Sequence, residues 1–345
     1  MSAFSIFRPC PTRAVGDAGP YGGVLGYLLF SSSDRVQHRA VGDAGPYGEA
    51  AGSPGFRPAP SLRLILHFSH IIPISVLAKA VDLCYYHLMV NYVIIIVGVP
   101  MVDIHCHILP NSDDGADSMD TALLMAQMAV DSGVDTIIAT PHCNLPGTKE
   151  KNFRDAPLAL RFVELIRRIR DAGIPLEILP GAEVMCMPDT IELLRKKQLV
   201  TLARSDYLLV EFYFDERPDY MEDMLSAIQA EGLTPVVAHP ERYQAVQRTP
   251  AMIEQWFESG YVIQLNKGSI LGRLGRGAEK TAAWILSRGL AHAVASDAHD
   301  TLVRTPGMES LQELLEYRCG ADYTQLLLEL NPRRIARNLP LIRAD

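Results

Sequence analysis

Short apolar runs alternate with amphipathic stretches from Met101 onward. The runs are rich in β-branched residues and have strand length, whereas the stretches between them repeat at helical spacing. The predicted strands are 102–108, 134–139, 176–179, 207–212, 234–238, 261–265 and 291–295. The predicted helices are one that Ser118 caps and that ends near Gly133, then 153–172, 220–230, 250–258, 278–288 and 307–315. This alternation predicts an α/β fold with a parallel sheet covered on both faces, and seven units favour a barrel over an open sheet.

The first hundred residues have a different pattern. The ten residues RAVGDAGPYG begin at Arg13 and again at Arg39. A structural repeat normally needs about three copies, with apolar positions that stack on a neighbour, and these two Gly- and Pro-rich copies have neither. We interpret the stretch through Pro60 as disordered, or as sequence that is not part of the natural protein.

An apolar tract follows, and its segment 83–102 contains no Asp, Glu, Lys or Arg, which is about the length that spans a bilayer. Against a membrane segment, His87 and Asn91 interrupt the run, and its end already belongs to the strand that carries Asp103. Three alternatives stay open: a misassigned extension before a true start at Met101, a membrane or targeting segment, and an accessory region. We therefore expect an N-terminal extension, residues 1–100, that is not part of the fold, and a catalytic domain, residues 101–345.

The composition narrows the classes of function. A net charge of -8 argues against a general binder of nucleic acids or anionic membranes, so partners must be recognised at a site. The six cysteines form no C-x-x-C pair and no regular framework, which is typical of a reduced intracellular protein, and we expect a cytoplasmic location. They are Cys10, Cys84, Cys106, Cys143, Cys186 and Cys319.

Metal-ligand residues follow most of the predicted strands. They are His105, His107, Asp113 and Asp114, then His142, Glu183, His239 with Glu241 and Arg242, and finally Asp297 and His299. In a parallel α/β barrel the active site lies at the carboxyl ends of the strands. A single histidine there is more often a loop or core residue, but five of the ten histidines together with several carboxylates indicate a shared site.

The spacing of these residues indicates metal. In His105-Cys106-His107 the strand period of two points both imidazoles to one side, and Asp297-Ala298-His299 is expected to do the same. Mixed imidazole and carboxylate ligands suit Mn²⁺, Fe²⁺ or Zn²⁺. One ion cannot use so many ligands, so we expect two or three ions that share bridging carboxylates, an arrangement suited to phosphoryl transfer.

The segments MVDIHCHILPNSDDGADSMDTAL, TIIATPH, LPGAE, VVAHPERY and ASDAH occur in this order. Together they resemble the PHP (polymerase and histidinol phosphatase) superfamily. DIHCHILP, DDGA and HPER resemble more narrowly its bacterial capsule-biosynthesis tyrosine-protein phosphatases. The resemblance extends from Met101 to about Pro340 and leaves out the first hundred residues; the loop 143–151 departs from the family pattern.

The resemblance implies a distorted seven-unit, TIM-like barrel with two or three divalent ions, most often manganese. It implies a phosphotyrosine protein as substrate, namely the tyrosine autokinase of capsule and exopolysaccharide export, and contact with a membrane only through that kinase. It places eight residues on the metals, namely His105, His107, Asp114, His142, Glu183, His239, Asp297 and His299, with Asp113 as an alternative to Asp114. Arg242 and Arg304 would hold phosphate oxygens, and Asp297 or His299 would assist proton transfer to the leaving phenolate.

Other functions remain as alternatives. A cysteine-based tyrosine phosphatase needs an arginine six residues after its cysteine, but Lys149 stands there after Cys143, and Pro146 interrupts the run of amide donors. We therefore interpret Cys106 and Cys143 as packing residues. A histidinol phosphatase keeps the same fold and stays open. A nuclease conflicts with the negative charge, and a kinase-binding scaffold would be expected to have lost ligands.

Overall fold

The computed structural model describes residues 100–344. The predictions for the repeat, and for the apolar tract up to residue 99, lie outside these residues. Within 100–344 no helix combines the length and the apolar character that crossing a bilayer requires.

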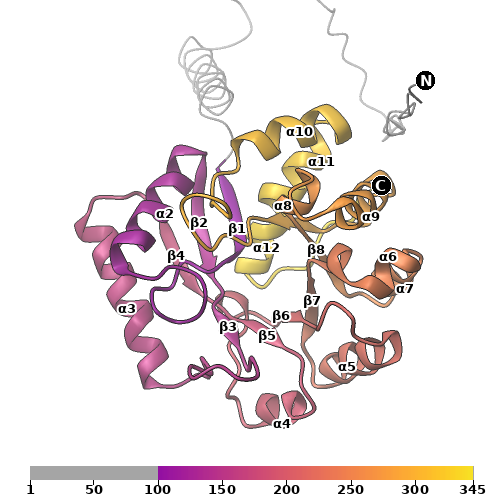
Figure 1. Cartoon of the computed structure of the whole chain (residues 1–345), viewed down its shortest axis with the longest axis horizontal. Coiled ribbons are helices and arrows are strands. Elements are labelled where there is room, and N and C mark those ends of the chain that lie inside the picture. The colour runs from indigo at the N-terminus through magenta and orange to yellow at the C-terminus, as the bar shows by residue number, and fades with distance from the viewer. Residues whose placement is uncertain (1–99, 345) are drawn as a thin grey trace, which may run out of the picture. The chain divides into compact units, whose positions relative to one another are not determined.

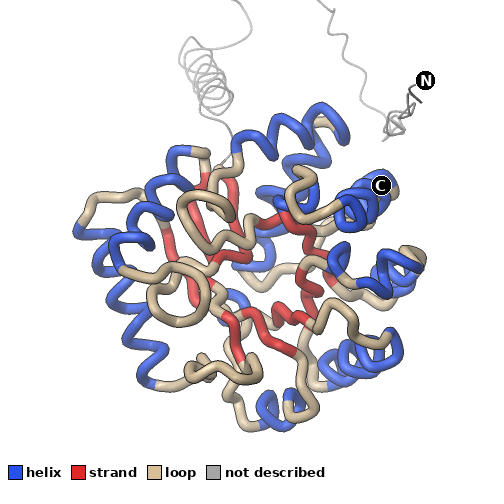
Figure 2. Tube along the Cα trace, in the orientation of Figure 1, coloured by secondary structure: helices blue, strands red, loops and turns tan. Residues whose placement is uncertain are grey.

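All strand pairs of the described chain are parallel, which confirms the predicted α/β class. The strands are β1 Met101–Cys106, β2 Val134–Ala139, β3 His142–Cys143, β4 Glu177–Pro180, β5 Glu183–Met185, β6 Tyr207–Glu211, β7 Thr234–Ala238, β8 Val262–Asn266 and β9 Ala293–Ala295. Figure 2 shows the strands in the interior of the domain with the helices around them. The seven predicted strands are present, and β3 and β5 are additional short ones.

The helices are α2 Met119–Asp131, α3 Ala156–Asp171, α4 Thr190–Arg195, α5 Pro218–Ala230, α6 Gln244–Arg248, α7 Met252–Glu258, α8 Lys267–Ile270, α9 Arg276–Ser287, α10 Glu309–Cys319, α11 Ala321–Gln325 and α12 Asn331–Ala336. Figure 1 shows their order around the strands. The predicted cap of α2 is confirmed, because the Ser118 hydroxyl accepts a hydrogen bond from the amide of Thr121. Short 3₁₀ turns at Leu202–Arg204 and Pro240–Arg242 and a π-helical turn at Leu326–Leu330 complete the elements.

The strands form two sheets that continue into each other. One has the order β1-β2-β4 and the other the order β3-β5-β6-β7-β8-β9. The chain passes from the first sheet to the second at Thr140–Pro141, between β2 and β3, and again at Gly181–Ala182, between β4 and β5. At the other end, Cys106 of β1 forms a parallel bridge with Ala298, just after β9.

Alternate residues of the strands pack into two apolar clusters. Tyr207 and Leu209 of β6 belong to a smaller cluster that Ile335 of α12 joins. Leu208 and Val210 belong to the larger cluster, which contains the apolar faces of the surrounding helices. This period of two leaves Glu211 on the same side of β6 as the smaller cluster. The strand ends therefore carry polar side chains towards one face of the sheet.

Candidate active site

A cavity of about 330 Å³ lies where the strands end, and most of the predicted site residues line it. Polar side chains come from β3, β5, β6 and from the loops after β1, β7 and β9. They are Asp114, His142, Glu183, Glu211, His239, Arg242, Asp297 and Arg304. Side chains that are up to 190 residues apart in the sequence, from Asp114 to Arg304, therefore line the same cavity.

His105 and His107 point to the same side, as their spacing predicts, and their Nε2 atoms are 3.2 Å apart. Nδ1 of His105 lies 3.0 Å from Oε1 of Gln264, and Nδ1 of His107 lies 2.7 Å from Oδ2 of Asp113. Both acceptors are oxygens, which favours a proton on Nδ1 of each ring. A ring with that single proton has its Nε2 free to bind a metal ion.

Glu183, at the start of β5, is the central carboxylate. Its Oε2 lies 3.2 Å from Nε2 of His105, 3.3 Å from Nε2 of His107 and 3.1 Å from Nδ1 of His142. Its other oxygen lies 2.9 Å from Nε2 of His239. Burial alone would raise the pKa of Glu183, but the surrounding imidazoles hold that pKa well below its usual range.

His299 and His142 form a second group with Asp114. Oδ1 of Asp114 is 3.4 Å from Nε2 of His299 and 3.5 Å from Nε2 of His142. Nδ1 of His299 lies 3.1 Å from the backbone oxygen of Asp297, which places its proton there and leaves Nε2 facing Asp114. The rings of His107 and His299 are 3.8 Å apart, so the two groups adjoin.

Glu211 is a site residue that the sequence interpretation missed. Its Oε1 lies 2.8 Å from Nδ1 of His142, and the two form a third group with Glu183. Burial and His107 lower the pKa of His142, but the carboxylates of Glu183 and Glu211 raise it to about 9. The sequence carries one signal for Glu211, namely its position at the end of the predicted strand 207–212.

The buried polar atoms of these groups fit a cation better than they fit one another. Glu183 Oε2, Glu211 Oε1, His142 Nδ1 and His299 Nε2 are buried without a well-aligned hydrogen bond, although Glu211 Oε1 and His142 Nδ1 lie 2.8 Å apart. Such atoms are rare in native structures because leaving them unpaired costs free energy. There are three sets of potential ligand atoms, and within each set the atoms lie within 4.8 Å of one another. Imidazole nitrogens and carboxylate oxygens with facing lone pairs form a suitable donor set for divalent metal ions.

Asp297 joins these groups to two arginines. Its Oδ1 lies 3.5 Å from Nε2 of both His105 and His107. Its Oδ2 lies 2.6 Å from a guanidinium nitrogen of Arg304 and 3.5 Å from one of Arg242. Burial raises the pKa of Asp297, but His105 and other neighbours lower it well below its usual range. The carboxylate is thus held ionised between imidazoles on one side and guanidinium groups on the other.

The backbone that presents Asp297 differs from the predicted one. β9 ends at Ala295, and Asp297 has a left-handed φ of 49°. His239, after β7, is also left-handed, with a φ of 35°. The predicted strand does end at Ala295, and the left-handed φ of Asp297 interrupts the strand period that was expected to continue through His299. The two side chains still point to the same site, as predicted, with Oδ1 of Asp297 3.6 Å from Nδ1 of His299. Strained backbone of this kind is typical of functional sites.

Asp113 and Asp114 have different surroundings. Asp113 accepts hydrogen bonds from the His107 ring and from the amides of His142 and Gly115, whereas Asp114 faces His142 and His299. A Cβ atom at Gly115 would lie only 2.1 Å from the backbone oxygen of His107, so this turn requires glycine. Asp114 is therefore the aspartate of the pair that points towards the cavity.

Three other residues named from the sequence lie outside the cavity. Glu241 is buried and accepts a hydrogen bond from the amide of Asn266, and burial raises its pKa. Cys106 and Cys143 are fully buried, and burial raises the pKa of the Cys143 thiol to about 12. A buried thiol that stays protonated is a poor nucleophile.

The cavity lining also has apolar residues. They are Leu145, Met185, Phe212, Tyr213 and Phe214, and we call them the apolar wall. The guanidinium carbon of Arg242 lies 4.3 Å from the centre of the Phe214 ring, which holds this cation at the edge of the wall. A ligand with an anionic group and a flat apolar group would match these two sides.

Comparison with known proteins shows the family of this domain. The sequence model of the family described as "Capsular polysaccharide synthesis, CpsB/CapC" matches residues 101–337. The tyrosine-protein phosphatase YwqE of Bacillus subtilis is 36% identical over 245 residues, which cover 70% of this chain and 94% of that relative. The tyrosine-protein phosphatase CpsB of Streptococcus pneumoniae is 31% identical over 243 residues, covering 68% and 98%. A crystal structure from work on these two proteins, described as unique metal-dependent tyrosine phosphatases, superimposes with a TM-score of 0.66 at 35% identity, covering 71% of this chain and 97% of that one.

Proposed function

Because the chain belongs to the CpsB/CapC family of capsular polysaccharide synthesis, we propose that it is a metal-dependent protein-tyrosine phosphatase. The single observation that carries this proposal is the convergence of the three ligand groups, which share His107, His142 and Glu183, beside two arginines and an apolar wall. Such a site can bind a phosphate ester through its anionic end and an aryl group through its other end.

The residues that would hold the metals are those whose lone pairs face one another. We assign His105, His107, Glu183 and Asp297 to one ion, Asp114, His142 and His299 to a second, and Glu211 with His142 and Glu183 to a third. His239, whose Nε2 lies 2.9 Å from Oε1 of Glu183, is assigned to the metals as a further ligand. Manganese is the favoured metal, with Fe²⁺ or Zn²⁺ as alternatives. Divalent ions bound there would lower the pKa of water and neutralise phosphate charge.

Arg242 and Arg304 would bind the equatorial oxygens of the phosphate. Both guanidinium groups line the cavity and both now lie near Oδ2 of Asp297. The pKa of Asp297 is held well below its usual range, and Nδ1 of His299 lies 3.1 Å from the backbone oxygen of Asp297. We assign both residues to the metals, and one of them would also assist proton transfer to the leaving phenolate.

The tyrosyl ring of the substrate would lie on the apolar wall. Tyr213 and Phe214 are 42% and 43% exposed, so they offer ring faces to a ligand rather than filling a core. An aromatic pair in offset or edge contact contributes about 0.5–1.5 kcal/mol beyond the buried area. This contact would favour phosphotyrosine over alkyl phosphates.

The biological setting follows from the family. We propose that the substrate is the tyrosine autokinase of capsule and exopolysaccharide export, and that the enzyme meets a membrane only through this kinase. A cytoplasmic location is consistent with the free and buried state of Cys106, Cys143 and Cys186.

We also infer that residues 101–345 constitute the catalytic domain and that its strands form a distorted seven-unit barrel. Counting β2 with β3 and β4 with β5 as interrupted strands gives seven, and the Cys106–Ala298 bridge brings the last next to the first. Residues 1–100 would then be dispensable for catalysis.

The deciding experiment measures metal content and hydrolysis together. The full chain and residues 101–345 would be assayed with a phosphotyrosine peptide, histidinol phosphate and a phosphodiester. We expect both proteins to retain metal and to prefer the phosphotyrosine peptide. A preference for histidinol phosphate or for the diester would contradict the proposed substrate, and absence of metal from an active protein would contradict the mechanism.

A further inference from the structure

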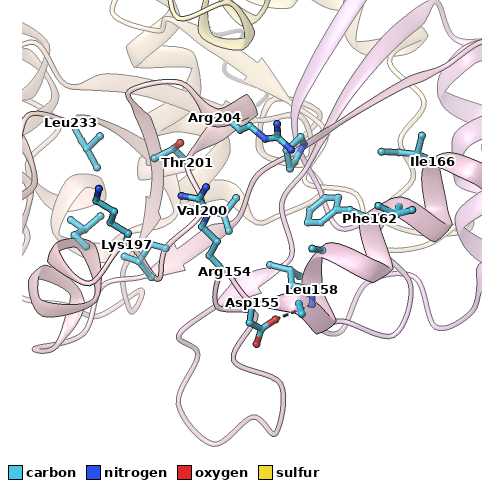
Figure 3. Close-up of a pocket in the computed structure, with 16 residues that line it drawn as sticks. Arg154, Asp155, Leu158, Phe162, Ile166, Lys197, Val200, Thr201, Arg204 and Leu233 are labelled. Carbon is cyan, nitrogen blue, oxygen red and sulfur yellow. Dashed lines mark hydrogen bonds between the residues drawn. The ribbon is translucent and has the colours of Figure 1, made fainter.

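A second and larger cavity, of about 880 Å³, lies on the outside of the sheet beside α3. It shares no residue with the active site. Figure 3 shows Phe162 and Ile166 of α3 on one side, Lys197 and Thr201 on the other, and Arg154, Val200 and Arg204 between them. We call this cavity the α3 groove. Its volume exceeds that of a single side chain and is in the range of ligand-binding sites.

The helix that follows α3 contributes little to the groove. α3 has 16 residues, whereas α4 has only 6 and contributes Leu194 alone to the lining. Leu158 and Phe162 of α3 are buried at the base, but Val163 is 62% exposed and Ile166 is 43% exposed. Apolar side chains of α3 therefore border the groove and are left partly exposed by the rest of residues 100–344.

Three cations line the groove: Arg154, Lys197 and Arg204. Among the ion pairs and side-chain hydrogen bonds within residues 100–344, none involves these three side chains. The single acidic residue of the groove, Asp155, is occupied as the cap of α3, where it accepts a hydrogen bond from the amide of Leu158. Three cations and one carboxylate give the groove lining a formal charge of +2, in a chain whose net charge is -8.

The backbone holds two of these cations in uncommon conformations. Lys197 has a φ of 57° and Arg204 a φ of 62°, and Ala203 beside it has a φ of 51°. Left-handed backbone is unfavourable for residues other than glycine and clusters at sites that bind ligands. Lys197 and Arg204 are therefore presented by a fixed loop.

We propose that the α3 groove binds an acidic segment of a partner protein whose carboxylates alternate with apolar side chains. The carboxylates would pair with Arg154, Lys197 and Arg204, and the apolar side chains would cover Val163 and Ile166. Complementarity of charge and of apolar surface carries this choice of partner. The groove is a separate surface, so this inference does not depend on the chemistry of the active site.

The arrangement of the cations distinguishes a peptide from a single phosphate or a lipid headgroup. Figure 3 shows Lys197 and Arg204 apart from each other, with Thr201 and Val200 between them. One small anion would need all the cations to converge, as an anion clamp does. Charges that are spread along an apolar groove match an extended or helical chain with several carboxylates.

The test uses the full chain and a fluorescent peptide of alternating glutamates and leucines, measured by anisotropy at low and physiological salt. Replacement of the three cations in Arg154→Gln/Lys197→Gln/Arg204→Gln should weaken binding at least tenfold and reduce its salt dependence. Val163→Ser should also weaken it. Matched controls are Arg276→Gln/Lys280→Gln/Arg318→Gln on α9 and α10, away from α3 in Figure 1, and Leu124→Ser on α2, with Leu124 59% exposed. The controls should bind as the unchanged chain does.

Hydrolysis of a small aryl phosphate, measured on the same samples, should be unchanged by every groove variant, so failure of the catalytic proposal is visible separately. Equal peptide affinity for the groove variant and the unchanged chain, or no saturable binding, would overturn the inference. Two other outcomes would also overturn the inference, because they would identify another occupant of the groove. One is that the unchanged chain binds anionic lipid vesicles and the triple groove variant does not. The other is that the unchanged chain self-associates in sedimentation and the triple groove variant does not.

Discussion

Nδ1 of His107 lies 2.7 Å from Oδ2 of Asp113, and this contact determines which nitrogen of His107 faces the metal groups. The same carboxylate accepts hydrogen bonds from the amides of His142 and Gly115. A ring whose Nδ1 proton is held by a carboxylate presents an unprotonated Nε2 to a metal ion. The hydrogen bond to the carboxylate also makes the ring a better ligand. Asp113 is thus linked to the site through His107.

Asp113→Asn should weaken metal binding or activity by about 10- to 100-fold. In either orientation of the amide, its NH₂ group meets a donor, either the His107 ring with the His142 amide or the Gly115 amide. Metal titration of the variant measures the effect. Asp117→Asn is a suitable control, because its exposed carboxylate accepts only local hydrogen bonds at the start of α2. Unchanged metal affinity in Asp113→Asn would separate Asp113 from the site.

Arg242→Ala should retain the ions and lose turnover by about 10²-fold or more, since a guanidinium cannot bind a metal but can stabilise transition-state charge. His107→Ala should instead lose metal and activity together. Metal analysis beside steady-state kinetics distinguishes the two results, with Arg248→Ala as an exposed control. Normal kinetics in Arg242→Ala would exclude this arginine from phosphate binding.

Glu211→Gln should reduce the number of bound ions and slow turnover by about 10- to 100-fold, because an amide is a weaker ligand than the carboxylate that now faces His142. Asp215→Asn, an exposed change a few residues further on, should have no effect on either quantity. The metal-to-protein ratio is the decisive measurement. A full complement of ions in Glu211→Gln would remove the third group from the proposal.

Chelation should abolish activity, and added Mn²⁺ should restore it. Cys143→Ala should keep most of the activity, because the thiol is buried with a pKa raised to about 12 and does not line the cavity. Hydrolysis of a phosphotyrosine peptide before and after chelation measures both effects. An inactive Cys143→Ala protein with its full metal content would revive the thiol mechanism.

His292 predicts a pH dependence of stability away from the metals. It is buried, accepts a hydrogen bond from the amide of Ile263 and stacks on Phe257. Burial, together with Arg343, lowers its pKa to about 4. The unfolded chain takes up this proton near pH 6.5 and the folded chain only near pH 4, so stability falls as pH decreases through that window.

At pH 5 this loss amounts to about 2 kcal/mol relative to pH 7. Urea unfolding of the metal-free protein at both pH values measures it, compared with His292→Asn, whose amide oxygen can still accept the hydrogen bond but does not titrate. The difference between the two proteins isolates His292 from the other histidines. Equal pH dependence in both would contradict the prediction.

The sequence predicted the strands because each is a run of β-branched residues between turns. It could not predict β3 and β5, since two or three residues carry no period. The helices α4, α6 and α8 were missed for a similar reason, because with 6, 5 and 4 residues they are too short to show a helical period. The interruption at Thr140–Pro141, which moves the chain from one sheet to the other, depends on packing between segments far apart in the sequence.

Most of the candidate site could be predicted because its residues follow strands. Glu211 was missed because it stands alone at the end of β6, without a histidine nearby in the sequence. Asp113 and Asp114 are adjacent, so only the fold distinguishes their surroundings. The left-handed backbone at His239 and Asp297 leaves no pattern in the sequence, because neither residue is a glycine.

Gly115 has a consequence for how this site can change over generations. Any side chain at this position would collide with the backbone of His107, so the turn that carries Asp113 and Asp114 would move away from the first strand. Both aspartates therefore depend on a residue that has no side chain of its own. A lineage could exchange one metal for another through its ligands, but it could not pass through a substitution at Gly115 without giving up both aspartates at once.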